Sequence, residues 1–179
     1  HDATMAAVVK LSDETVERLC AAYEHVYPVN YNCDGQVAVA GERAQLEKFY
    51  DDVAAAGGRS VPLKVSSGFH SPFMDGAARN FHAYISNVAF TKPEITTYAN
   101  RTAEPYGSDV RTLLFEQINH PVRWAKTMQA LGTQGFDTFI ECGAGSVLRR
   151  LAQKNLADCR AYAVETPDGI EKLREAGVL

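Results

Sequence analysis

The first 65 residues alternate between a strand period and a helix period, and this alternation restricts the fold more than any other feature of the chain. Four short apolar or alternating runs have the length and pattern of β-strands: 5–9, 29–32, 37–40 and 61–65. Apolar residues spaced three and four apart predict one helix from Ser12 to Val26 and another between Gly41 and Gly57. The sequence therefore predicts the element order βαββαβ.

Two local signals support this order. Ser12 followed by two acidic residues is typical of a helix start, with the serine as N-cap and the acids in the first turn. Asp34-Gly35 supplies the positive φ angles that a tight hairpin turn between two strands requires. A βαββαβ order is that of the ferredoxin-like unit, so we expect residues 1–66 to form a small ferredoxin-like subdomain.

Residues 67–179 follow a different pattern, in which longer helices alternate with single strands. Ser71-Pro72 is typical of a helix start, and the helix is expected to reach Val88. Further strands are predicted at 95–99, 138–142 and 161–164, and further helices at 110–116, 122–131, 147–154 and 169–176. Strands that alternate with helices predict a parallel layer. We therefore expect an α/β fold, mixed with α+β in its front part, whose second domain is 67–179.

Charge, cysteine content and hydropathy exclude several classes of protein. With 18 Lys and Arg against 22 Asp and Glu, the net charge of −4 argues against a nucleic-acid partner. No stretch of about 18 apolar residues is present, so no membrane partner is expected. The cysteines, Cys20, Cys33, Cys142 and Cys159, form no C-x-x-C pair, so neither a disulfide framework nor a metal site is expected. These features favour a cytoplasmic protein with reduced thiols and no metal.

His70 is the candidate with a chemical argument behind it. It stands directly before the predicted N-cap Ser71, where the partial positive charge of a helix N-terminus would keep the imidazole neutral, as a general base must be near pH 7. The carboxylate of Asp75 in the first turn has the opposite effect, because a negative charge favours the protonated imidazolium. A histidine that simply packs in a loop fits the residues equally well. His25, His82 and His120 have no such setting and are interpreted as surface or helix-packing residues.

Residues 143–146 (GAGS) follow a predicted strand and open a helix, a geometry that can bind an anion through backbone N–H groups. A dinucleotide fingerprint needs a third glycine where Leu148 stands, and the Gly-Lys-Ser/Thr of a P-loop is missing. A plain strand-to-helix turn with Ser146 as N-cap is therefore the preferred interpretation. The sequence also lacks a Gly-x-Ser-x-Gly elbow, so spacing alone leaves a candidate base with no nucleophile.

Four segments, taken in order, carry a resemblance to a known family. They are residues 29–37 (VNYNCDGQV), 68–74 (GFHSPFM), 117–124 (QINHPVRW) and 139–148 (FIECGAGSVL). In this order they resemble motifs of the C-terminal part of malonyl-CoA:acyl-carrier-protein transacylases and of the related acyltransferase domains of fatty-acid and polyketide synthases. Asp34 and Ala144 stand where the family has proline.

The resemblance implies an α/β-hydrolase-like domain with a Ser–His pair, covered by a ferredoxin-like insert. It implies that His70 is the catalytic base, that the backbone carbonyl of Gln117 orients it, that Asn30 and Asn32 lie near the substrate cleft, and that Phe69 selects malonyl. The implied reaction is ping-pong transfer of malonyl from malonyl-CoA to the phosphopantetheine thiol of acyl carrier protein in fatty-acid biosynthesis (EC 2.3.1.39), with no bound cofactor.

Three parts of the family pattern belong upstream of these residues: the Gly-His-Ser-x-Gly elbow, an arginine for the malonyl carboxylate and a glutamine of the oxyanion hole. We therefore expect this chain to be a fragment of the transacylase and to be inactive alone. Two alternatives stay open. One is an acyltransferase domain of a polyketide synthase, and the other is a non-catalytic fragment that binds carrier protein.

Overall fold

The computed structural model describes residues 2–91 and 93–179 and shows a mixed α/β fold, as predicted. Contacts divide the chain into two compact units, His1–Thr127 and Met128–Leu179. The contacts thus group residues 67–127 with the N-terminal subdomain. This grouping by contacts does not test whether residues 1–66 and 67–179 belong to different folds, so the division expected between residues 66 and 67 stays a prediction.

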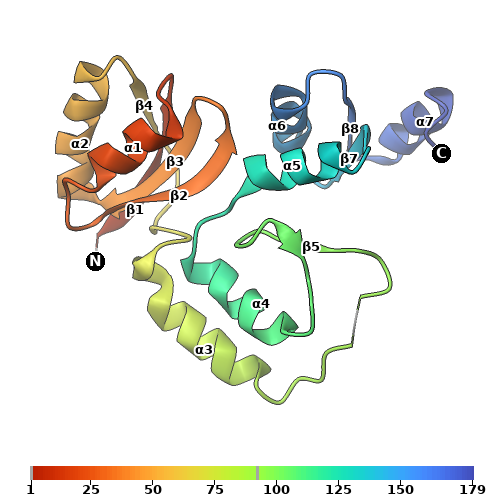
Figure 1. Cartoon of the computed structure of the whole chain (residues 1–179), viewed down its shortest axis with the longest axis horizontal. Coiled ribbons are helices and arrows are strands. Elements are labelled where there is room, and N and C mark those ends of the chain that lie inside the picture. The colour runs from red at the N-terminus through yellow and green to blue at the C-terminus, as the bar shows by residue number, and fades with distance from the viewer. Residues whose placement is uncertain (1, 92) are drawn as a thin grey trace. The chain divides into compact units, whose positions relative to one another are not determined.

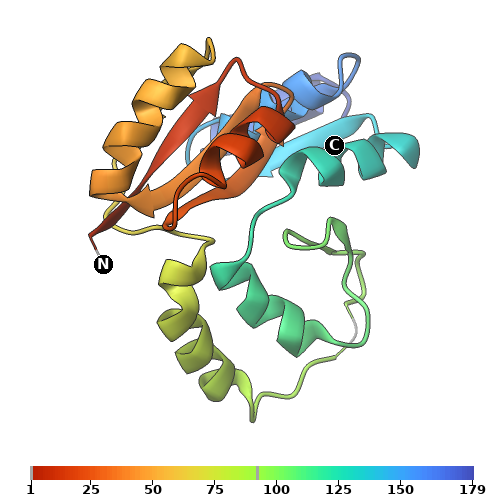
Figure 2. The same ribbon diagram turned by 60° about the vertical axis from the view of Figure 1, so that its left-hand side comes forward.

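The first unit begins with a four-stranded antiparallel sheet that two helices cover on one face (Figure 1). Its elements are β1 (Ala3–Val9), α1 (Asp13–Cys20), β2 (Val26–Cys33), β3 (Gln36–Glu42), α2 (Arg43–Ala55) and β4 (Arg59–Pro62). The strand order across the sheet is β2-β3-β1-β4. This is the predicted βαββαβ unit, and the view in Figure 2 shows both helices on the same side of the sheet.

A continuous apolar core joins this sheet to its helices. Val8 and Val39 from the strands, Val16 from α1 and Phe49 from α2 are each exposed by 1% or less. The Tyr23 ring meets the edge of the Phe49 ring with centroids 5.8 Å apart. Because removing apolar surface from water is the main favourable contribution to folding, this cluster holds the helices to the sheet.

The predicted turn signals are present, while some predicted boundaries are wrong. Ser12 caps α1 through its side-chain oxygen, and Gly35 has a φ of +67° in the β2–β3 turn. The first helix ends at Cys20, and Val26 instead begins β2, where it pairs with Gly41 and is buried. The strand predicted at 61–65 ends at Pro62. Beyond it, the N–H of Leu63 still donates to the Met5 carbonyl oxygen and the Thr4 hydroxyl donates to the Val65 carbonyl oxygen.

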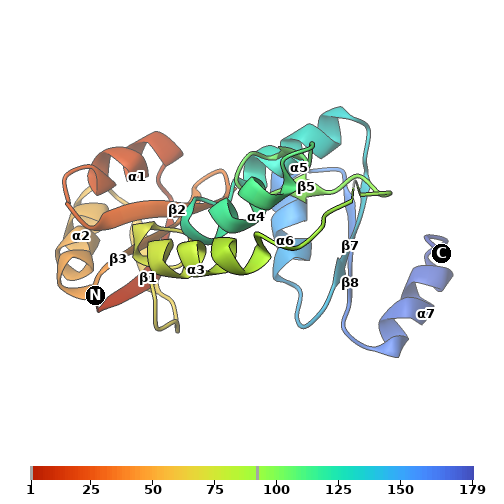
Figure 3. The ribbon, with the colours of Figure 1, turned by 90° about the horizontal axis from the view of Figure 1, so that it is seen from below.

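The rest of the first unit is built around two helices that lie side by side (Figure 3). Its elements are the 3-10 turn η1 (Pro72–Met74), α3 (Asp75–Ile85), β5 (Tyr98–Ala99), β6 (Glu104–Pro105) and α4 (Val110–Asn119). The His82 ring of α3 packs on Phe115 of α4 with centroids 4.5 Å apart, which agrees with its predicted packing role. The strand predicted at 95–99 shortens to β5, and α3 ends before Val88.

β5 does not belong to a parallel layer, contrary to the prediction. After β5 the chain reverses direction, and β5 pairs with β6 in an antiparallel two-stranded sheet. The reversal is closed by the N–H of Ala103, which donates to the Ala99 carbonyl oxygen at 2.9 Å, and Ala103 has a positive φ of 61°. The polar turn that the sequence places after residue 99 is thus a tight hairpin, and no crossover helix lies between β5 and β6.

The second unit has the predicted parallel arrangement. α5 (Trp124–Thr133) crosses the division between the units, and β7 (Thr138–Cys142), α6 (Val147–Asn155), β8 (Arg160–Val164) and α7 (Pro167–Glu175) follow it. β7 and β8 pair in parallel over five residues each, with α6 as the crossover helix. Among the described residues, no helix is both long and apolar enough to cross a membrane.

Candidate active site

The loop that carries His70 is held in an unusual backbone conformation. His70 has a φ of +60°, in the left-handed region, and its side chain is half-buried. The next residue, Ser71, is only 1% exposed; its hydroxyl donates to the Gly68 carbonyl oxygen and accepts from the Phe73 N–H. A non-glycine residue in this region costs about 1–3 kcal/mol and persists where its surroundings determine it. The two contacts of Ser71 therefore present His70 in a defined direction.

His70 contacts a helix end that lies 47 residues further along the chain. Its Nδ1 lies 2.8 Å from the carbonyl oxygen of Gln117 in α4. A carbonyl oxygen only accepts, so in the neutral ring Nδ1 carries the proton and Nε2 keeps the lone pair. This is the contact that the family resemblance implies, and it leaves Nε2 available to take a proton.

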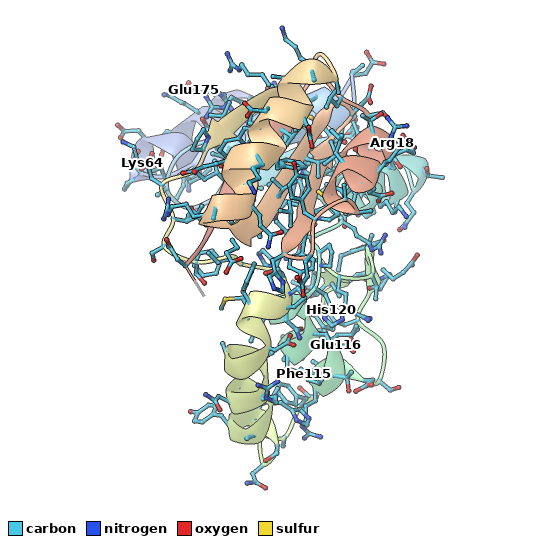
Figure 4. All side chains as sticks on the ribbon, turned by 90° about the vertical axis from the view of Figure 1, so that its left-hand side faces the viewer. Arg18, Lys64, Phe115, Glu116, His120 and Glu175 are labelled. Carbon is cyan, nitrogen blue, oxygen red and sulfur yellow. The ribbon has the colours of Figure 1, made fainter. Side chains whose placement is uncertain are left out.

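The Gln117 carbonyl is free for His70 because of the residue four positions later. In a continuing helix this oxygen would accept the N–H of residue 121, but Pro121 has no N–H. Nδ1 of His120 lies 2.9 Å from the preceding carbonyl oxygen, of Glu116, and 2.8 Å from Oδ1 of Asn119. Figure 4 labels Glu116 and His120 at this end of the helix. Side chains thus occupy both carbonyl oxygens at the end of α4, where the backbone supplies too few donors.

His70 opens onto a cleft of about 540 Å³ within the first unit. The cleft is lined by residues of β2, of the loop and helix start around His70, and of the end of α4: Tyr27, Pro28, Tyr31, His70, Ser71, Pro72, Asp75, Asn119, His120 and Pro121. The Asn119 amide nitrogen donates to the Asp75 carboxylate at 2.8 Å, which ties α4 to the start of α3. A rigid wall therefore surrounds the imidazole.

The cleft contains residues that sequence reasoning did not single out. His120 was interpreted as a surface or packing residue, yet it lines the cleft beside His70. Tyr31 also lines it, and its hydroxyl donates to Glu17 Oε1 at 2.7 Å. Burial, together with this bond, raises the pKa of Tyr31 well above its usual range, so the phenol stays protonated. No spacing signal marks these residues, since three separate segments bring them together.

Besides Gln117, which touches His70 from outside the lining, three more predicted site residues do not line this cleft. Asn30 is half-buried on β2, where it forms a parallel bridge with Val122. Asn32 is half-buried further along the same strand, and Phe69 is 39% exposed. The structure brings His70 and Gln117 together, and the substrate-binding roles of Asn30, Asn32 and Phe69 stay predictions.

Two of the four cysteines are poor nucleophiles in this structure. Burial raises the pKa of the Cys20 thiol to about 12, and burial also raises the pKa of Cys159. Both thiols therefore stay protonated near neutral pH. In the part of the chain that the structure describes, no group of three or more His, Cys, Asp or Glu side chains is arranged to hold a metal.

The first turn of α6, directly after the glycine loop at 143–146, is capped by a carboxylate of the chain itself. Glu141 accepts the N–H of Leu148 at 3.1 Å through one oxygen and the N–H of Arg149 at 2.8 Å through the other. Glu141 therefore already uses two N–H groups at the start of α6, while anion binding by residues 143–146 stays a hypothesis. Ser146 stands at the N-cap position of α6 but makes no side-chain capping bond. The strand-to-helix turn is present with Ser146 at the predicted position, but the side chain that caps α6 is that of Glu141.

We expect Glu141 to make the stability of the second unit pH-dependent. The Arg149 N–H, followed by that of Leu148, lowers the pKa of Glu141 below its ordinary 4.5. A lowered folded-state pKa contributes stability that is present above pH 4.5 and is lost as the pH falls through the folded-state value. Glu141→Gln should therefore unfold more easily than the original chain at pH 7, and this difference should shrink below pH 4.5. Urea unfolding at both pH values measures it.

Glu175→Gln is the matched control for this prediction. Glu175 is an exposed residue of α7 in the same unit, so its loss should leave the urea midpoint nearly unchanged at either pH. A constant difference between Glu141→Gln and the original chain from pH 7 to pH 3 would contradict a stabilising role of the Glu141 carboxylate.

Comparison with known proteins identifies the class to which this fold and site belong. Residues 2–172 match the family described as acyl transferase domain, so the chain is a member of that family. It is 31% identical over 172 residues to the malonyl CoA-acyl carrier protein transacylase of Escherichia coli K12, with 93% of this chain and 56% of that protein covered. It is 36% identical over 160 residues to the polyketide biosynthesis protein ThaF of Burkholderia thailandensis, covering 87% of this chain and 14% of ThaF.

Solved structures agree with this assignment. FabD of Acinetobacter baumannii is 32% identical, with a TM-score of 0.90 over 98% of this chain and 58% of that one. A malonyl-transacylase solved in complex with its type II polyketide synthase acyl-carrier protein is 31% identical, with a TM-score of 0.91 over 97% and 59%. The chain therefore spans little more than half the length of these transacylases.

Proposed function

We propose that the protein to which these residues belong transfers the malonyl group of malonyl-CoA to the phosphopantetheine thiol of acyl carrier protein. The observation that carries this proposal is the 2.8 Å contact between His70 Nδ1 and the Gln117 carbonyl oxygen at the wall of a cleft. The contact leaves His70 Nε2 as a proton acceptor in a chain of the acyl transferase family. The names of its transacylase relatives supply the substrate class.

His70 acts as base and then as acid in each half of the proposed reaction. Its Nε2 takes the proton of a serine hydroxyl while the serine oxygen bonds to the malonyl carbonyl carbon; the C–S bond breaks and the CoA sulfur leaves with that proton. In the second half Nε2 takes the proton of the phosphopantetheine thiol, its sulfur attacks the malonyl ester, and the serine regains a proton. The Gln117 carbonyl stabilises the imidazolium at Nδ1–H in both halves.

The remaining parts of the proposal concern residues and partners. The serine would come from outside these 179 residues, because the sequence contains no Gly-x-Ser-x-Gly elbow. Phe69, directly before His70, would favour malonyl over a branched acyl group, and Asn30 and Asn32 would contact the substrate. Malonyl-CoA is a substrate and phosphopantetheine belongs to the carrier partner, so no bound cofactor is needed. The described residues contain no disulfide between the four cysteines, which fits the reducing cytoplasm.

A second candidate, a polyketide synthase acyltransferase, is favoured by the 36% identity to ThaF. The two candidates share their chemistry and differ in the carrier protein that accepts the malonyl group. Relative transfer rates to a fatty-acid carrier protein and to a polyketide carrier protein distinguish them.

We predict that this chain alone transfers no malonyl, because a base without a nucleophile has nothing to activate. The test compares the chain with the same chain joined to the portion of the E. coli transacylase that it does not match. Labelled malonyl should appear on carrier protein only with the joined protein. Transfer by the chain alone would show that the nucleophile lies within it. Carrier binding without transfer by the joined protein would support the non-catalytic alternative.

A further inference from the structure

The side chain of Gln117 is engaged as fully as its backbone carbonyl. Its Oε1 accepts the N–H of Asn100 at 2.7 Å, and its Nε2 donates to the hydroxyl oxygen of Tyr106 at 2.6 Å. A backbone N–H only donates, so the amide oxygen must face Asn100 and the NH₂ group must face Tyr106. Gln117 thus lies between the β5–β6 hairpin on one side and His70 on the other.

The hairpin is tied to α4 by more than this one amide. Arg101 Nη1 pairs with Glu116 Oε2 at 3.0 Å, one residue before Gln117. The Arg123 N–H donates to the Asn100 carbonyl oxygen at 2.8 Å. Asn100 is therefore held from both sides, by Arg123 through its carbonyl and by Gln117 through its N–H. The hairpin is consequently a firm support for the end of α4.

Support at this point matters because the end of α4 has little backbone bonding of its own. Pro121 supplies no N–H to the Gln117 carbonyl, and His120 uses its ring to satisfy the preceding one. A helix end whose carbonyls lack backbone donors frays unless side chains or neighbouring segments hold it. The Gln117 amide joins such a neighbouring segment to the peptide whose oxygen meets His70.

We propose that Tyr106 and the backbone N–H of Asn100 are positioning groups for His70. By holding the Gln117 side chain they fix the direction of the Gln117 carbonyl, which selects the Nδ1–H tautomer of the imidazole and leaves Nε2 as the proton acceptor. The proposal rests on the proposed function for the catalytic use of that tautomer. The tautomer itself is a property of this chain that can be measured without any reaction.

The test is the tautomer ratio of His70 in the ¹⁵N-histidine-labelled chain, observed by two-bond ¹H–¹⁵N NMR at a pH where the ring is neutral. In the original chain the Nδ1–H form should dominate. Tyr106→Phe removes only the hydroxyl, and Gln117→Leu removes the amide while keeping the backbone carbonyl. Tyr106→Phe thus loses one hydrogen bond and Gln117→Leu loses two. Since one such bond contributes about 1 kcal/mol, we expect either change to lower the ratio of Nδ1–H to Nε2–H at least about fivefold.

Gln117→Glu is the conservative rescue. Its carboxylate can accept the Asn100 N–H at one oxygen and the Tyr106 hydroxyl proton at the other, so the ratio should stay near that of the original chain. Tyr84→Phe is the matched control for loss of a tyrosine hydroxyl, since Tyr84 is 79% exposed on α3. Its ratio should be unchanged.

His120 separates an effect specific to His70 from a general loosening of α4. Its Nδ1 lies 2.9 Å from the carbonyl oxygen of Glu116 and 2.8 Å from Oδ1 of Asn119, the last residue of α4. The proposal requires the His70 ratio to change while the His120 ratio does not. Equal changes in both histidines, or no change of His70 in Tyr106→Phe and Gln117→Leu, would overturn it. The proposed function is tested by a different experiment. It would be wrong if the joined protein transferred malonyl equally well after His70→Ala.

Discussion

Replacing His70 with alanine should lower malonyl transfer by about 10²–10⁴-fold in the chain joined to the unmatched portion of the E. coli transacylase. This is the range that a positioned general base contributes. The loss is expected because His70 Nε2 is the acceptor that the Gln117 contact leaves free. The readout is the rate at which labelled malonyl reaches carrier protein. Both half-reactions should be slowed, since each passes a proton through the same nitrogen.

His82→Ala is the control for this experiment. His82 is an exposed residue of α3 that packs on Phe115 and does not line the cleft, so its loss should leave the transfer rate nearly unchanged. If the two variants lose activity equally, the effect comes from disturbance of α3 and α4. The assignment of His70 as the base would then be wrong.

The largest stability effect should come from Phe49→Ala. Phe49 is fully buried at the centre of the core between α2 and the sheet, and it contacts the Tyr23 ring. Its loss leaves a cavity that the surrounding strands fill only in part, so the free energy of unfolding should fall by about 3–5 kcal/mol. Urea unfolding followed by circular dichroism measures this change.

Lys48→Ala tests the same helix without touching the core. Lys48 is the exposed neighbour of Phe49, so its replacement should change the free energy of unfolding by less than about 0.5 kcal/mol. A cost below about 1 kcal/mol for Phe49→Ala would mean that the helices do not depend on this cluster. The ferredoxin-like unit would then need another source of stability.

Much of the fold is predictable because its pattern is local. The alternation of periods before residue 65 specifies which face of each element is apolar, and Asp34-Gly35 specifies the hairpin. The errors lie where tertiary pairing competes with periodicity. Val26 continues a helical spacing, yet it is buried as the first residue of β2 opposite Gly41. Tyr98 and Ala99 have a strand pattern, yet a sharp reversal pairs them with β6.

The candidate site likewise has a part that the sequence predicts and a part that depends on tertiary contacts. Position before a helix start singles out His70 from the sequence, and the resemblance to transacylases adds the Gln117 carbonyl. The tertiary structure alone decides that this oxygen meets Nδ1, because 47 residues separate the two and packing of α3 on α4 brings them together. It also decides that Tyr106 supports Gln117.

The sequence by itself thus determined the order of elements, the small antiparallel unit at the front and a histidine without a nucleophile, since these follow from hydrophobic period, turn chemistry and motif. Only the tertiary structure decided the tautomer of that histidine and the cleft it faces. It also decided that Glu141 caps the helix that follows the glycine loop. The physical reason is that hydrogen bonds between segments depend on distance in space, which the local pattern of residues does not encode.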